Sequence, residues 1–168
     1  MKRLFTAVAA AALFASMGVT AAHAQNRTVI TQSGYANAAG TAQTGSRNGA
    51  VVNQRGGRQY ARGVQEGYRN FMRMDQYGTR NSVTTTQIGT DNFSATGQEG
   101  RNLRAETIQT GHGNVAGVAQ IGAGSRAVTD QDGTNNTSGI IQIGNGQDVE
   151  VRQRGDGNIS VVVQSGYN

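Results

Sequence analysis

Polar and small apolar residues follow one another along this chain with a fixed period of eleven residues. The motif Gln-x-Gly begins at Gln32 and returns at every eleventh position up to Gln164, thirteen times without an insertion or a deletion. Repetition at a fixed period is typical of repeat architectures, in which each unit packs only against its neighbours. The sequence therefore predicts a single repeat domain over residues 25–168, with no linker inside it.

Three columns of residues define the repeat. The glutamines are Gln32, Gln43, Gln54, Gln65, Gln76, Gln87, Gln98, Gln109, Gln120, Gln131, Gln142, Gln153 and Gln164. The glycines two positions later are Gly34, Gly45, Gly56, Gly67, Gly78, Gly89, Gly100, Gly111, Gly122, Gly133, Gly144, Gly155 and Gly166. Three residues after alternate glycines stand Asn48, Asn70, Asn92, Asn114, Asn136 and Asn158. The intervening units carry other residues there, such as Leu103 and Ser125, so the true unit is a pair of successive repeats.

Charged residues avoid every second position between one glutamine and the next. The positions five, seven, nine and eleven residues after each glutamine hold no charge, whereas Arg62, Glu106 and Glu150 stand at position eight. Successive side chains of a strand point to opposite faces, and an unpaired buried charge is strongly destabilising. The uncharged positions are therefore predicted to face inward, and this exclusion fixes the register of the strands.

The spacing predicts short strands separated by tight reversals. A strand of about five residues needs a following position that tolerates a positive φ, and glycine supplies it. A helix is a poor alternative because period-two alternation contradicts a 3.6-residue stripe. We predict an all-β fold, a parallel β-solenoid or cross-β stack with two strands per 22-residue coil and about six and a half coils. The inward glutamines and asparagines are predicted to form amide ladders along it, and the glycines to form its turns.

The first residues predict export. Lys2 and Arg3 precede an apolar, Ala-rich stretch, and Ala22-His23-Ala24 has the pattern of a cleavage site, so residues 1–24 are predicted to be a secretory signal peptide. An uncleaved anchor is the alternative, but the stretch is short for a span. The remaining chain has 13 basic and 10 acidic residues without a basic stripe, which argues against nucleic-acid binding. Cysteine is absent, which excludes disulfides and thiolate metal sites.

Residues that could carry catalysis are few. His112 stands alone in a predicted turn, where a solvated polar residue is the simpler interpretation. Asp130 with Asp132, and Asp148 with Glu150, could be paired carboxylates, but they fall on outward or turn positions with arginines nearby in the predicted stack. The sequence therefore predicts no catalytic residue, no cofactor and no metal site, and the protein is not expected to be an enzyme.

The repeat resembles that of the curlin family, whose pattern is Ser-x5-Gln-x-Gly-x-x-Asn-x-Ala-x3-Gln. The segment Gln32-Ser-Gly34-Tyr-Ala-Asn37-Ala-Ala39 up to Gln43 matches its second half, and Ser125 ahead of Gln131 matches its first. The match covers residues 25–168. The chain departs from the family pattern because its repeats begin almost at Gln25, without a polar secretion segment, and because it has more coils than is usual.

The resemblance implies a function that the spacing alone does not give. It implies a structural subunit of an extracellular curli-like amyloid fibre, exported through an outer-membrane pore and polymerising at the cell surface, with a role in biofilm matrix and adhesion. The implied partners are further copies of the chain and a nucleating or major-subunit homologue. The alternative is a soluble monomeric β-solenoid that binds ice or a glycan, for which the threonine column faces the wrong way and no end caps are visible in the sequence.

Overall fold

The computed structural model describes residues 25–166, which fold into thirteen β-strands with no helix among them. The strands are β1 (Arg27–Tyr35), β2 (Ala38–Ser46), β3 (Gly49–Gly57), β4 (Tyr60–Tyr68), β5 (Phe71–Thr79), β6 (Ser82–Thr90), β7 (Phe93–Arg101), β8 (Arg104–His112), β9 (Val115–Ala123), β10 (Arg126–Thr134), β11 (Thr137–Asn145), β12 (Asp148–Asp156) and β13 (Ile159–Gly166). Over this part of the chain there is accordingly no helix that could cross a membrane. The predicted signal peptide lies outside the described residues.

The strands are longer than the sequence predicted. The sequence predicted strands of about five residues. This predicted length is wrong, because β1 to β12 have nine residues each and β13 has eight. The Gln-x-Gly segment continues each strand instead of leaving it, since the residues of this segment pair with their counterparts one coil away, as Gln54 does with Gln76. Only two residues remain between one strand and the next.

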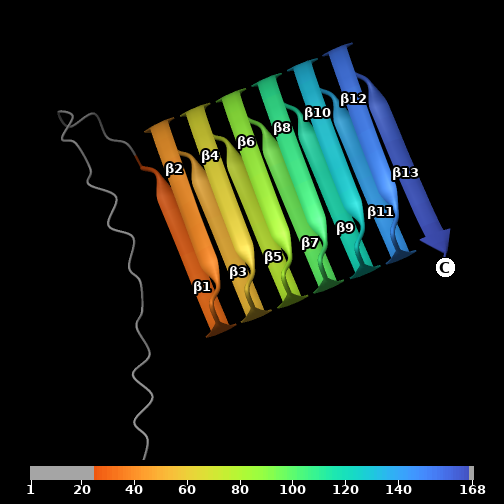
Figure 1. The fold of residues 1–168 in the computed structure, drawn as a ribbon. Coiled ribbons are helices and arrows are strands. Elements are labelled where there is room, and N and C mark those ends of the chain that lie inside the picture. The colour runs from red at the N-terminus through yellow and green to blue at the C-terminus, as the bar shows by residue number, and fades with distance from the viewer. Residues whose placement is uncertain (1–24, 167–168) are drawn as a thin grey trace, which may run out of the picture.

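The strands form two parallel sheets, and consecutive strands alternate between them (Figure 1). The odd strands make a seven-stranded sheet in the order β1-β3-β5-β7-β9-β11-β13, and the even strands make a six-stranded sheet from β2 to β12. Each strand pairs in register with the next strand but one in the chain, so that Gln65 lies beside Gln87 and Gly67 beside Gly89. The fold is a parallel β-solenoid with two strands per 22-residue coil, as the sequence predicted.

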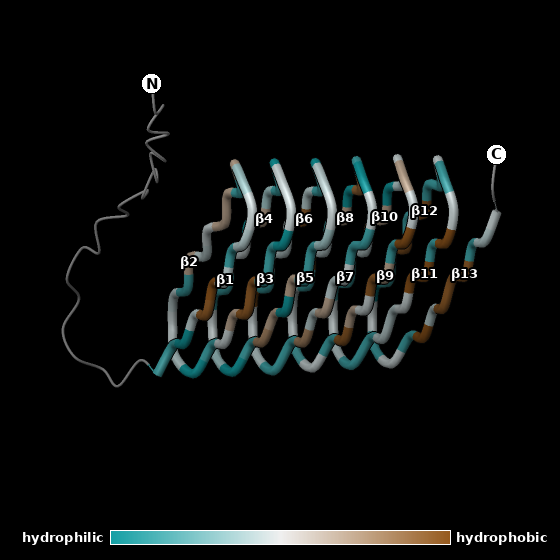
Figure 2. The backbone as a smooth tube through the Cα atoms, turned by 90° about the horizontal axis from the view of Figure 1, so that it is seen from below, coloured by the Kyte–Doolittle hydropathy of each residue, from teal (hydrophilic) through white to brown (hydrophobic). Residues whose placement is uncertain are grey.

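The interior lies between the two sheets, which Figure 2 shows as separate rows of strands with hydrophobic segments recurring along the odd row. The predicted inward columns supply every buried side chain of residues 25–166 except one, and no charged residue is buried. Met72 and Met74 of β5 fill the space opposite Gly63 of β4, where a Cβ would meet their side chains. Glycine in one sheet thus makes room for long side chains in the other.

The exception is Val128, which stands at the outward position eight and is only 8% exposed. In the register of the even sheet it lies between Glu106 and Glu150 of the neighbouring coils. Their longer side chains shield the smaller valine while the carboxylates stay in water. The alternation of faces therefore holds here too, because the burial of Val128 comes from its outer neighbours.

Candidate functional site

Glutamine side chains form two continuous ladders inside the stack, one for each sheet. In the odd sheet, Nε2 of Gln54 donates to Oε1 of Gln76 at 2.8 Å, and Gln76 donates to Gln98 at 3.0 Å. The same contact links Gln32 to Gln164 through the odd strands and Gln43 to Gln153 through the even strands. The structure thus brings all thirteen glutamines into the two columns, and each amide between the ends donates to one neighbour and accepts from the other.

The second amide proton of each ladder glutamine crosses the interior. Nε2 of Gln54 also donates to the backbone carbonyl of Ala38 at 3.1 Å, and Ala38 begins the facing strand β2. The contact recurs from Gln43 to Gln164 at 2.9 to 3.5 Å. Each glutamine therefore joins its own coil to the next and also ties one sheet to the other. Sequence reasoning missed this second bond.

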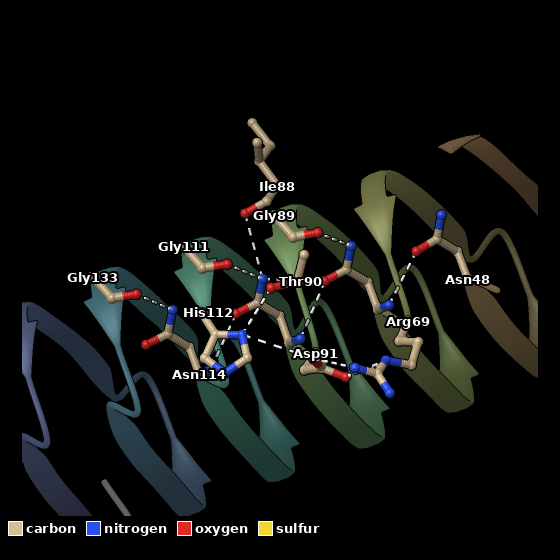
Figure 3. Close-up of polar contacts among 12 residues, drawn as sticks. Asn48, Arg69, Ile88, Gly89, Thr90, Asp91, Gly111, His112, Asn114 and Gly133 are labelled. Carbon is tan, nitrogen blue, oxygen red and sulfur yellow. Dashed lines mark hydrogen bonds and ion pairs between the residues drawn. The ribbon is translucent and has the colours of Figure 1, made fainter. Parts of the chain in front are cut away.

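The asparagines hold the turns, as Figure 3 shows for Asn114. Its backbone N–H donates to Oδ1 of Asn92 at 3.1 Å, and its Nδ2 donates to the carbonyl of Gly133, one coil further on, at 3.0 Å. The expected ladder of amide-to-amide bonds is present in three of the five neighbouring pairs of this column. These direct bonds join Asn92 to Asn70, Asn136 to Asn114 and Asn158 to Asn136, each between neighbouring coils. The shorter side chain also lies beside backbone groups that the turn leaves unpaired, and throughout the column it bonds to them.

The repeat glycines bend the strand ends. Twelve of the thirteen, from Gly34 to Gly155, have φ between 98° and 136°, a region that other residues rarely adopt. Space is a second reason for glycine. A Cβ built on Gly89 would overlap the carbonyl oxygen of Gly111 in the next coil and would lie 2.9 Å from its carbonyl carbon. The glycine column therefore lets successive turns stack at the spacing of the sheet.

A second residue of each turn also has a positive φ, and sequence reasoning missed it. Arg47, Arg58, Arg69 and Arg80, two positions after a repeat glycine, have φ of 55° to 57°. Other units place Ala36, Asp91, Asn102, Gly113, Gly124, Asn135, Gly146 or Gly157 at this position. The mixture of asparagine, aspartate and glycine in one column is the sequence signal that could have identified it, because these residues best tolerate the left-handed region.

Charged side chains lie at the turns and on the outer faces of the sheets. Arg69 pairs with Asp91 at 2.9 Å, and Nδ1 of His112 lies 2.7 Å from the hydroxyl of Thr90 and 3.8 Å from Asp91 (Figure 3). Both contacts of His112 fall on the same ring nitrogen. This geometry lacks the relay in which a carboxylate orients one nitrogen while the other takes a proton from a hydroxyl. The cluster instead joins polar side chains of adjacent coils.

The carboxylates singled out in the sequence all lie near arginines of the even sheet. Asp130 and Asp132 lie beside Arg152 and Arg154, Asp148 pairs with Arg126 at 3.2 Å, and Glu150 pairs with Arg152 at 2.5 Å. In the odd sheet, Asp75 raises the pKa of Arg73, first by a hydrogen bond to its guanidinium and then by its negative charge. These exposed pairs are of the kind that contributes little to stability.

The two ends of the stack expose what the middle buries. Ile30 on β1 occupies an inward position but is 40% exposed, whereas Val52, its neighbour in the next coil, is 0% exposed. At the other end the inward Val162 is only partly buried. Within residues 25–166, β1, β2, β12 and β13 each have a paired neighbour on one side only. On their open side, the backbone groups, ladder amides and inward side chains of these four strands lack the neighbouring coil that the middle strands have.

No protein-family model matches the chain, and no curated protein matches its sequence. The ladders and the open ends are thus the basis for assigning a function.

Proposed function

We propose that this protein is a structural subunit of an extracellular fibre of the curli kind, which grows by end-to-end stacking of β-strands. The observation that carries the proposal is the pair of open ends. Each end presents unpaired strand edges together with glutamine amides already aligned for another coil. An unprotected edge is a template for pairing with another chain, and a second copy offers the same columns in the same order.

The composition of the interior supports assembly over a stable monomer. The buried columns are mostly alanine, serine, threonine, valine and glutamine, with Met72, Met74, Leu103 and Ile140 as the largest apolar side chains. Such residues bury little apolar area against a backbone entropy of ~1 to 2 kcal/mol per residue. Each further coil covers one open end and repeats contacts that already exist in the stack. A single chain is therefore expected to be marginally stable and to gain stability when it joins a fibre.

A soluble solenoid that binds ice or a glycan is less well supported. An ice-binding surface needs a regular outward column of threonines, but Thr85, Thr107 and Thr129 are buried. The outward column of the even sheet at position eight is mixed and reads Gly40, Arg62, Thr84, Glu106, Val128 and Glu150. Such a column matches no repeating ligand.

The remaining parts of the proposal rest on the resemblance to curlins. The chain would be exported with residues 1–24 as its signal peptide, would cross the outer membrane through a pore, and would act at the cell surface in biofilm matrix and adhesion. Its partners would be further copies of itself and a homologous nucleating or major subunit. The proposal includes no catalytic activity, cofactor or nucleic acid.

The test is fibre growth from the chain Gln25 to Asn168, diluted from denaturant. We expect a lag that preformed seeds remove, and fibres that diffract at about 4.7 Å and about 10 Å. Val52→Asp and Val51→Asp provide matched variants, because Val52 is buried and Val51 points outward in the same strand. Val52→Asp should prevent growth and Val51→Asp should only delay it. A chain that stays monomeric for days, or equal effects of the two variants, would contradict the proposal.

A further inference from the structure

The two ends of the stack have the same shape, a step formed where one sheet extends beyond the other. At one end β1 precedes β2, and at the other β13 follows β12, so the odd sheet projects by half a coil at both ends (Figure 1). This follows from the odd number of strands in the described part of the chain, seven in one sheet and six in the other. Two projecting steps on the same side cannot fit together by simple translation.

Direct stacking of one odd sheet on another leaves a gap. If β1 of the next subunit paired with β13, then β2 of that subunit would lie two coil spacings above β12. One strand would be missing from the even sheet at every junction, and the backbone groups on both sides of the gap would lack partners. Only one of the two glutamine ladders would continue.

We infer that successive subunits of the fibre are related by a half turn about its axis, each rising by six and a half coils. After a half turn, β1 of the next subunit pairs with β12 and its β2 pairs with β13, so that both steps are filled. The rise is about 31 Å at the strand spacing of a sheet. This inference rests on the proposed function, and it specifies the partner surface as a second copy rotated by a half turn.

The ladders continue through this junction. Carrying the 22-residue register across it sets Gln32 of the next subunit beside Gln153, and Gln43 of the next subunit beside Gln164. At the ladder ends, and counting partners within residues 25–166, Nε2 of Gln153 donates only to the carbonyl of Thr137 and Nε2 of Gln164 only to that of Asp148. The half turn therefore gives each terminal amide the neighbour that every interior glutamine has.

Charge also favours the half turn. Asp148 of β12, paired on one side with Arg126 at 3.2 Å, meets Arg27 of the next subunit on its other side. In direct stacking Arg27 would instead lie beside Ile159, which is 78% exposed at the end of the stack. The carboxylate thus lies between two arginines in the half-turn junction, but beside only one arginine in the direct junction.

The half turn has a consequence for the fibre surface. The outer face of the odd sheet carries exposed apolar side chains, including Ile121, Ile141 and Val161, while that of the even sheet carries Asp130, Glu150 and Arg152. Rotation of every second subunit alternates these faces along each side of the fibre. No continuous apolar stripe forms, which limits association of fibres side by side.

Crosslinking of single-cysteine chains tests the junction, because the native chain has no cysteine. Thr31, Arg152 and Val163 occupy equivalent outward positions and are exposed. Fibres grown from an equal mixture of Thr31→Cys and Arg152→Cys chains are treated with a short bifunctional thiol reagent, dissolved and sized on a denaturing gel. We expect a covalent dimer from this mixture and none from Thr31→Cys mixed with Val163→Cys, because the half turn places that second pair on opposite faces.

The control is one chain carrying both Thr31→Cys and Asn53→Cys, which are neighbours in the register of β1 and β3 and must react within the fibre. Crosslinking of Thr31→Cys with Val163→Cys would overturn the half turn in favour of direct stacking. Dimers from fibres of Thr31→Cys alone would overturn the half turn in favour of head-to-head stacking. The half turn would also be overturned if neither mixture gave a dimer while the control reacted. In these outcomes fibres still form, so the proposed function stands, whereas a chain that forms no fibre removes both.

Discussion

The stacked glycines allow a sharp test, because the same substitution should have opposite effects at two nearby positions. At Gly89 the φ is +119°, and a Cβ would overlap the carbonyl oxygen of Gly111 in the next coil. Gly111 would have to move away and would weaken the bond that its carbonyl accepts from Asn92 at 3.0 Å. Strain of ~1 to 3 kcal/mol and a hydrogen bond of about 1 kcal/mol give a loss of about 2 to 4 kcal/mol for Gly89→Ala.

Gly97 is the matched control. It lies on the next strand, its φ is outside the left-handed region, and no atom lies within 4 Å of the Cβ that alanine would add. Alanine there reduces the freedom of the unfolded chain without disturbing the fold, which stabilises by about 0.4 to 1 kcal/mol. Gly97→Ala should therefore favour the assembled state slightly.

The concentration of soluble chain that remains when fibre growth stops measures both effects. Because each 1.4 kcal/mol is a factor of ten, Gly89→Ala should raise this concentration by roughly 30-fold or more, and Gly97→Ala should lower it by roughly two- to fivefold. Seeding from wild-type fibres ensures that the endpoint is an equilibrium and not a slow lag. Equal residual concentrations for the two variants would refute the stacking of the glycine column.

Two further substitutions test the ladder and the junction. Gln109→Glu sets a carboxyl into a dry column where burial raises its pKa above the usual ~4.3. The protonated form is tolerated, so fibres should form at about pH 4 and the soluble fraction should rise as pH increases through the raised pKa. Thr86→Glu on the outer face, whose register neighbours Val64 and Ile108 carry no charge, should show no such rise. A flat pH profile for both variants would count against the buried ladder. Gly155→Ala has only Nδ2 of Asn158, at 3.7 Å, near the new Cβ within its own chain, but in the half-turn junction it faces Gly34 of the next subunit. Gly155→Ala should therefore slow seeded elongation strongly while lowering the denaturant stability of the soluble chain less. Unimpaired elongation would argue against the half-turn contact.

Much of the fold could be predicted from the sequence because charge exclusion and periodicity act at every repeat. The absence of charge from alternate positions determined which side of each strand is inside, and it correctly separated the outward Val161 and Val163, more than 60% exposed, from the partly buried Val162. The glycine spacing likewise predicted the position of the first positive φ. These features depend on local chemistry that repeats thirteen times.

The features that sequence reasoning missed depend on distances between elements. The second bond of Gln54 reaches Ala38 across the interior, and whether it can do so depends on how closely the two sheets approach. The asparagine bonds to glycine carbonyls of the next coil require the geometry of a stacked turn, which is not encoded in any single unit. Val128 is buried by Glu106 and Glu150, which lie one coil away on either side.

In the proposed fibre, folding and assembly would use the same contact. The bond from Gln54 to Gln76 within the chain is of the same kind as the one that the half-turn junction would form from Gln153 to Gln32 of the next subunit. A substitution that weakens the stacking of coils therefore weakens the fold and the fibre together, whereas one confined to β1, β2, β12 or β13 acts mainly on the junction. Soluble solenoids separate folding from assembly by covering their ends with dissimilar caps. Within residues 25–166 the terminal coils keep the repeat columns uncovered. In the proposed fibre, the step from a folded chain to a fibre would therefore require no kind of contact that the chain does not already make with itself.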